Sequence, residues 1–114
     1  MGLLEIVWDG ICDFIGSCIN FIIDVIDGIF NFFDNVVGWF REQFLVPERH
    51  TPFIGNEEAI KGMLKTAPKK DVGIFRGVYD NQTDEITELE VVEADSLDAK
   101  TREVLGNDPL VVLS

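Results

Sequence analysis

The chain has 114 residues, enough for one small domain with an appendage, and a formal net charge of −12 from 21 acidic and nine basic side chains. A chain this acidic repels nucleic-acid phosphates, so nucleic acid is not expected as a partner. Cys12 and Cys18 point about 120° apart if both lie on one helix, so they cannot bridge within it. They are expected to be reduced, with a disulfide between two chains as the alternative.

The segment from Leu3 to Phe44 is predominantly apolar, but its polar and small residues recur at a fixed interval. Two series with a spacing of seven run through it: Asp13, Asn20, Asp27, Asp34 and Arg41, and Gly10, Ser17, Asp24, Asn31 and Gly38. On an ideal helix these positions fall within an arc of about 140°, and the rest of the circumference is almost entirely apolar. The pattern predicts one amphipathic helix from about Leu3 to Leu45, about 60 Å long and ended by Pro47.

This predicted helix has two faces that bear on function. The narrow polar face, here called the polar seam, consists of Asp13, Ser17, Asn20, Asp24, Asp27, Asn31 and Asp34. The broad apolar face, expected to drive assembly, includes Phe14, Phe21, Ile22, Ile26, Phe30, Phe33, Val37 and Phe40. We interpret the pattern as a coiled-coil repeat with the polar and apolar roles exchanged.

After the helix, residues 47–55 contain two prolines and are predicted to be a linker. The only histidine, His50, lies in this linker and is expected to be a solvated loop residue. A short helix is predicted from Glu57 to Lys65, with Asn56 as its N-cap.

The remaining segments have clear strand and helix signals. Val72–Tyr79 and Ile86–Val92 are predicted to form a hairpin around the polar turn Asp80–Glu85. Ser96 is predicted to cap a helix over Leu97–Leu105 that ends at Gly106, and Leu110–Leu113 is predicted to be a strand. The expected fold is therefore α+β, with a long N-terminal helix (1–46), a linker (47–55) and a small acidic α-β-β-α-β domain (56–114).

The sequence contains no recognisable catalytic pattern. It has no phosphate-binding glycine loop, and its single histidine has no cysteine, serine or second histidine at a telling spacing. No catalytic residue, cofactor or metal site is predicted, and we expect a protein that is not an enzyme.

A helix with so broad an apolar face needs a partner, because monomers rarely expose more than a few hundred Å² of contiguous apolar surface. A lone transmembrane span is disfavoured, since Asp24 and Asp27 would each cost roughly 2.5–3.5 kcal/mol near its centre. The first hypothesis is a homo-oligomer in or on a lipid bilayer, with the polar seam lining a pore that favours cations. Basic residues after the helix would then hold the C-terminal domain in the cytoplasm.

Two alternatives need no lipid. Apolar helices could form the core of a cytoplasmic homopolymer, either a filament or a tube. The helix could also lie in a groove of a larger complex, with the acidic domain as a recognition module. No secretory signal is expected, because no positively charged segment precedes the apolar run.

Overall fold

The computed structural model describes residues 2–17, 23–64 and 68–113, and these form a mixed α+β fold, as the sequence predicts. In chain order the elements are α1 (Leu3–Ser17), β1 (Ile23–Phe30), the π-helical turn η1 (Phe33–Val37), α2 (Gly38–Glu42), β2 (His50–Asn56), the 3₁₀ turns η2 (Glu57–Ala59) and η3 (Lys61–Met63), β3 (Val72–Asp80), β4 (Glu85–Leu97), α3 (Ala99–Leu105) and β5 (Leu110–Val112).

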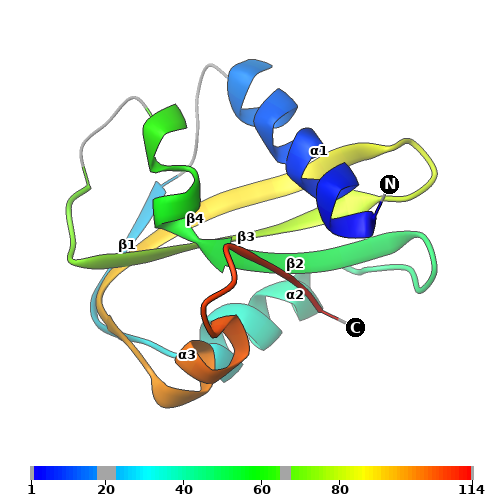
Figure 1. Cartoon of the computed structure of the whole chain (residues 1–114). Helices are drawn as coiled ribbons and strands as arrows, with labels where there is room; N and C mark the ends of the chain where they lie inside the picture. The colour runs from blue at the N-terminus through cyan, green and yellow to red at the C-terminus, as the bar shows by residue number, and fades with distance from the viewer. Residues whose placement is uncertain (1, 18–22, 65–67, 114) are drawn as a thin grey trace.

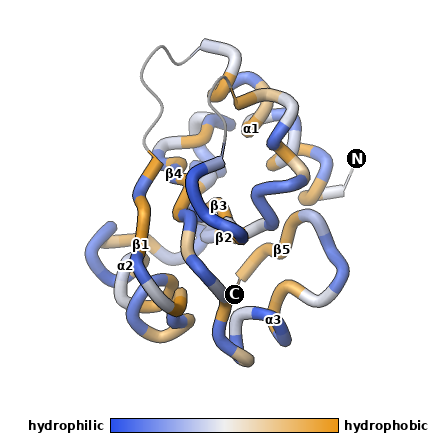
Figure 2. The backbone as a smooth tube through the Cα atoms, turned by 90° about the vertical axis from the view of Figure 1, so that its left-hand side faces the viewer, coloured by the Kyte–Doolittle hydropathy of each residue, from blue (hydrophilic) through white to orange (hydrophobic). Residues whose placement is uncertain are grey.

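The five strands form one sheet in the order β1-β4-β3-β2-β5. The edge strand β1 runs parallel to β4, and the other neighbours are antiparallel. Helix α1 covers one face of the sheet, and α2 and α3 cover the other (Figure 1). The view at right angles shows the same three layers, with α1 above the strands and α2 and α3 below them (Figure 2).

The sheet separates two apolar clusters. On the α1 side, Val7 and Ile11 are fully buried against residues of the central strands. On the other side, Phe30 of β1 packs with Val36 of η1 and Leu105 of α3. Because both faces are covered, β3 is buried along almost its whole length.

Two phenylalanines pack at the centre of the sheet, each over a glycine of the neighbouring strand. Phe53 on β2 pairs with Gly77 on β3, and Gly55 pairs with Phe75. A Cβ atom on Gly77 would lie 2.5 Å from Cζ of Phe53, and one on Gly55 would overlap the Phe75 ring. The two rings meet edge to face with centroids 6.2 Å apart. Only glycine leaves room for this packing at either position.

The predicted helix from Leu3 to Leu45 is wrong, because helix α1 ends at Ser17 and β1 occupies Ile23–Phe30. Gly28 has φ +107°, a conformation that no right-handed helix contains. The register of β1 shifts between Ile26 and Ile29, so a bulge interrupts the alternation by which a strand is recognised. Folding the segment back buries apolar side chains that a single helix would leave exposed.

Several other expectations are corrected. The predicted linker contains β2, and residues 23–30 join the same sheet as the predicted C-terminal domain. The expected helix from Glu57 is a pair of 3₁₀ turns, and its expected end at Lys65 lies outside the described residues. The N-cap of α3 is Asp98 rather than Ser96, because β4 continues to Leu97.

Other local expectations are confirmed. The hairpin of β3 and β4 is present, as are the Asn56 cap, the strand β5 and the helix end at Gly106, which has φ +55°. These segments carry their signals within a few residues, which is why the sequence alone indicates them.

Substitution of Gly77 by alanine tests the packing at the centre of the sheet. We expect Gly77→Ala to lower the free energy of unfolding by about 1–3 kcal/mol, because the new methyl group would collide with the Phe53 ring. Gly62→Ala is the matched control, since a Cβ there meets nothing within 4 Å. The measurement is urea denaturation of both variants; equal midpoints would contradict the described packing.

Candidate functional site

The structure distributes the predicted polar seam over three elements. Asp13 and Ser17 lie in the second half of α1, Asp24 and Asp27 lie on β1, and Asp34 lies in η1, with Asn31 just before it. Asn20 lies outside the described residues. Local contacts explain two of these side chains: Ser17 Oγ donates to the Asp13 backbone carbonyl at 2.9 Å, and Asn31 Oδ1 accepts from the Asp34 backbone N–H at 3.0 Å. Within the described residues they do not form one continuous face.

The predicted apolar face is likewise divided between the two cores. Phe14 packs against the α1-side cluster. Phe30 is fully buried in the other cluster, against which Ile26, Val37 and Phe40 pack. Phe33 is 64% exposed. Phe21 and Ile22 lie outside the described residues.

Arg76 joins the β1 edge to α2. Its Nη1 donates to the Asn35 carbonyl at 2.6 Å, and its guanidinium carbon lies 4.7 Å from the centroid of the Trp39 ring. Its Nη2 lies 3.6 Å from Asp24 and 3.4 Å from Glu90. Burial lowers the pKa of Arg76, and the two carboxylates act in the opposite direction. Asp24, expected in the polar seam, therefore serves an ion pair within the fold.

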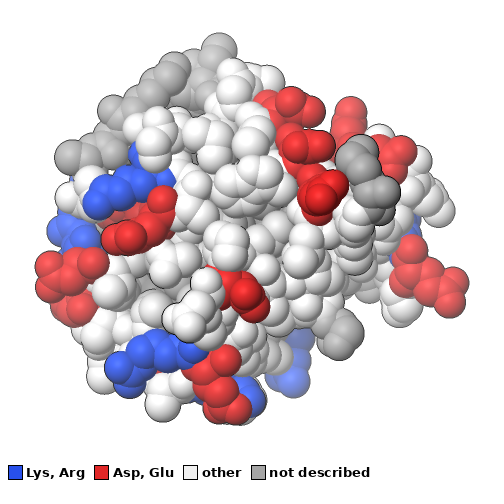
Figure 3. All heavy atoms as spheres, in the orientation of Figure 1, with Lys and Arg blue, Asp and Glu red and all other residues white. Residues whose placement is uncertain are grey.

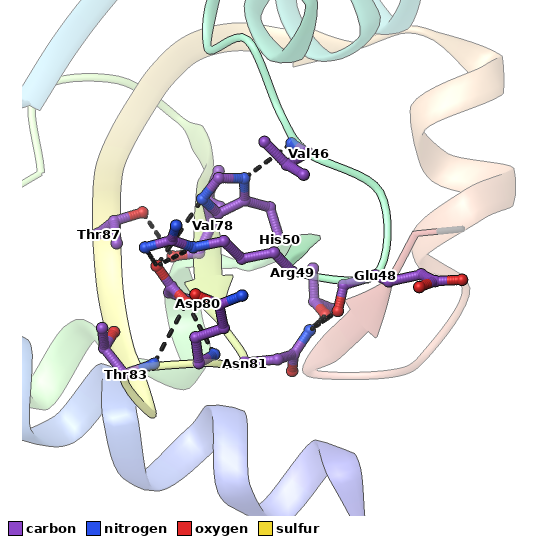
Figure 4. A network of polar contacts seen from close by, with 11 residues as sticks. Val46, Glu48, Arg49, His50, Val78, Asp80, Asn81, Thr83 and Thr87 are labelled. Atoms are coloured by element: carbon purple, nitrogen blue, oxygen red, sulfur yellow. Dashed lines mark hydrogen bonds and ion pairs between the residues drawn. The ribbon is translucent and has the colours of Figure 1, made fainter.

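A second polar network lies at the turn of the β3–β4 hairpin (Figure 4). The Asp80 carboxylate accepts a hydrogen bond from Arg49 Nε at 3.0 Å and others from the backbone of Gln82 and Thr83. The Arg49 hydrogen bond is the main cause that lowers the pKa of Asp80. His50 is half-buried rather than solvated: Nδ1 accepts from the Val46 N–H, and Nε2 lies 3.8 Å from Asp80. This network ties the start of β2 to the β3–β4 turn.

Among the described residues, the largest shift in pKa belongs to a carboxyl that the sequence did not single out. Glu57 on η2 and Glu93 on β4 are only 6% and 1% exposed, and their carboxyl groups hydrogen-bond to each other. Burial, followed by this hydrogen bond and the charge of Glu93, raises the pKa of Glu57 to about 7. A side chain at Gly73 would overlap the Glu57 carboxyl, and Glu93 Oε1 also accepts from the Lys69 N–H at 2.9 Å. No sequence signal links Glu57 to Glu93.

With its pKa raised to about 7, the Glu57 carboxyl can gain or lose a proton near neutral pH. Glu57 lines a cavity of about 140 Å³ together with Lys61 and Lys70. The cavity is well below the 300–1,000 Å³ typical of small-molecule sites. In the parts of the chain that the structure describes, no group of three or more His, Cys, Asp or Glu residues could hold a metal ion. Among the described residues, Glu57 therefore lies beside a cavity smaller than those that usually hold a small molecule.

A larger groove of about 460 Å³ lies beside the end of α2. We call its lining the Phe44 surface, and it consists of Val36, Val37, Phe40, Arg41, Phe44, Leu45, Pro52 and Leu113. Phe44 is 88% exposed and has φ +53°, a left-handed conformation that is rare for a bulky side chain. The backbone thus holds an aromatic ring in solvent at the edge of an apolar groove.

No protein-family model matches this chain, and no curated protein or solved structure matches it either. Among the described residues, no helix is both long enough and apolar enough to cross a membrane. Function is therefore argued from the side chains and surfaces themselves.

The Glu57–Glu93 pair predicts a specific pH dependence of stability. The pKa of Glu57 is about 7 in the folded chain against an ordinary 4.5, so its stabilising contribution is complete below pH 4.5 and is lost as pH rises through 7. Glu57→Gln keeps a hydrogen-bonding group but cannot titrate. We expect its stability relative to wild type to rise by on the order of 1 kcal/mol between pH 5.5 and 7.5.

The measurement is the urea midpoint of both proteins across that range, with Glu58→Gln as the control. Glu58 is the exposed neighbour of Glu57, and its substitution should leave the wild-type pH profile almost unchanged. Parallel profiles for Glu57→Gln and wild type would contradict a raised pKa of Glu57.

Proposed function

We propose that this chain is a non-enzymatic, self-associating protein whose copies pair through the Phe44 surface to form a homo-oligomer. The observation that carries the proposal is Phe44 itself, 88% exposed in a left-handed backbone conformation beside an apolar groove. Such a conformation costs on the order of 1–3 kcal/mol, and strained residues cluster at functional positions. A buried aromatic side chain would account for this strain; a solvated one does not.

A second copy of the chain fits this surface because the surface offers both a protrusion and a groove. In a twofold dimer each copy presents the same patch, so a feature on one copy must fit a feature on the other. Here the Phe44 ring of each copy would enter the groove of the other copy. Each ring would bury about 150–250 Å² of its surface. Val46, 50% exposed, lies two residues further along and would extend the contact.

Charge also favours this surface over others. A chain with net charge −12 repels its own copies wherever acidic side chains face each other. Among the described residues that line this groove there is no acidic side chain, and Arg41 is the one charged residue. Arg41 and the next residue, Glu42, are both exposed, so a twofold axis nearby would let Arg41 of one copy pair with Glu42 of the other. A standard interface of about 800 Å² per partner is roughly an eighth of the 6799 Å² surface.

The larger assemblies expected from the sequence rest on a different basis. A pore lined by the polar seam and a polymer built on apolar helices both assume one helix from Leu3 to Leu45, whereas α1 has 15 residues and ends at Ser17. Association through the Phe44 surface does not need that helix. The proposal therefore retains self-association but assigns it to the Phe44 surface instead of a long helix.

Sedimentation velocity of wild type and Phe44→Asp tests the proposal. We expect wild type to sediment as a homo-oligomer at tens of micromolar and the variant to dissociate at least tenfold more readily, because each copy loses its anchor and gains a repelling charge. Aspartate tolerates the left-handed backbone better than phenylalanine, so the variant should fold. The control is Phe33→Asp, which removes another exposed phenylalanine that does not line the groove and should leave association intact.

A monomeric wild type at every concentration would disprove self-association. Flotation with phosphatidylcholine vesicles tests whether lipid covers the surface instead. If a monomeric wild type floats with the vesicles and Phe44→Asp does not, lipid rather than a second copy covers this surface.

A further inference from the structure

A second apolar groove, separate from the Phe44 surface, lies between α1 and the start of β5. It has a volume of about 440 Å³ and is lined by Leu4, Glu5, Trp8, Asp9, Asp108, Pro109 and Leu110. Leu4 is 51% exposed, and the adjacent Leu3 is 44% exposed. Unlike the Phe44 surface, this groove combines an apolar floor with three carboxylates. We call it the α1 groove.

Helical spacing arranges the two kinds of side chain in parallel rows. Leu4 and Trp8 are four residues apart on α1, and so are Glu5 and Asp9, so each pair lies on one line of the helix surface. Asp13 continues the acidic row by one more turn. Figure 3 shows acidic side chains gathered over the α1 part of the surface, with uncharged surface beside them.

These carboxylates have no counter-charge within the fold as described. Among the described residues no Lys or Arg lines the α1 groove, and Glu5, Asp9 and Asp108 take part in no ion pair. Like-charged groups at a spacing of four destabilise a helix by a few tenths of a kcal/mol, so the pairing of Glu5 with Asp9 does not stabilise α1. The negative charge of this helix also acts on Cys12. Burial raises the pKa of the Cys12 thiol, and the charges of Asp9 and Asp13 raise it further.

We propose that the α1 groove binds a basic amphipathic helix of a partner protein. An apolar side chain of the partner would enter between Leu4 and Leu110, and Lys or Arg residues on either side of it would pair with the carboxylates. Charge complementarity favours a basic partner over the other candidates. A second copy of this acidic chain, an anionic lipid and a nucleic acid would all be repelled by the carboxylates. The proposal concerns a different surface from the homo-oligomer and stands independently of it.

The test is fluorescence anisotropy of a labelled 18-residue peptide of leucine and lysine with helical amphipathic spacing, compared with the same pattern in leucine and glutamate. We expect the lysine peptide to bind and the glutamate peptide not to bind. Glu5→Lys combined with Asp9→Lys should weaken binding of the lysine peptide at least tenfold. Leu4→Gln should weaken it several-fold without unfolding the chain, because half of the Leu4 side chain is already in solvent.

The matched control combines Glu88→Lys with Glu103→Lys, which changes the net charge by the same amount at exposed positions outside the groove. This variant should retain binding within about threefold. Equal loss in the two double variants would show non-specific attraction to an acidic protein, and absence of binding by wild type would also overturn the proposal. The same titration on Phe44→Asp separates the two surfaces, since binding should persist there whether or not the chain self-associates.

Discussion

Reciprocal packing of phenylalanine over glycine holds β2 and β3 in one register. Phe53 and Phe75 fill the α1 face because Gly77 and Gly55 stand opposite them. A slip of one strand by one residue would move its phenylalanine to the opposite face and bring side chains where only glycine fits. The remaining strands take their positions from this pair, β4 and β1 beyond β3 and β5 beyond β2.

Polar contacts then attach the N-terminal half to this centre. Arg76 projects from β3 to the opposite face and reaches Asp24 on β1 and the Asn35 carbonyl before α2. Asp80, at the end of the same strand, holds Arg49 at the entry to β2. Arg76 and Asp80 are buried, whereas their partners Asp24 and Arg49 are partly exposed, so each pair compensates a charge that the fold has removed from water. These contacts specify where the apolar N-terminal segment docks, and they leave Phe44 outside the core.

Elements whose signals are local could be predicted from the sequence. The hairpin of β3 and β4 alternates around a polar turn, and α3 ends at a glycine. The structure of the N-terminal half could not be predicted in this way, because its regularly spaced polar residues have several unrelated roles. Ser17 and Asn31 bond to backbone groups four and three residues away, while Asp24 and Asp27 pair with distant cations. The Glu57–Glu93 pair depends on tertiary contact alone.

The central claim is that the apolar segment after α1 is a strand of the sheet and not the continuation of a long helix. Backbone chemical shifts of the isotopically labelled full chain test it most directly. The structure predicts extended-strand shifts for Ile23–Phe30, with contacts in nuclear Overhauser spectra between Asp24 and Val92, which are partners in the β1–β4 register. Continuous helical shifts from Leu3 through Phe40 would contradict it, and would restore the long apolar helix as the element around which the chain assembles.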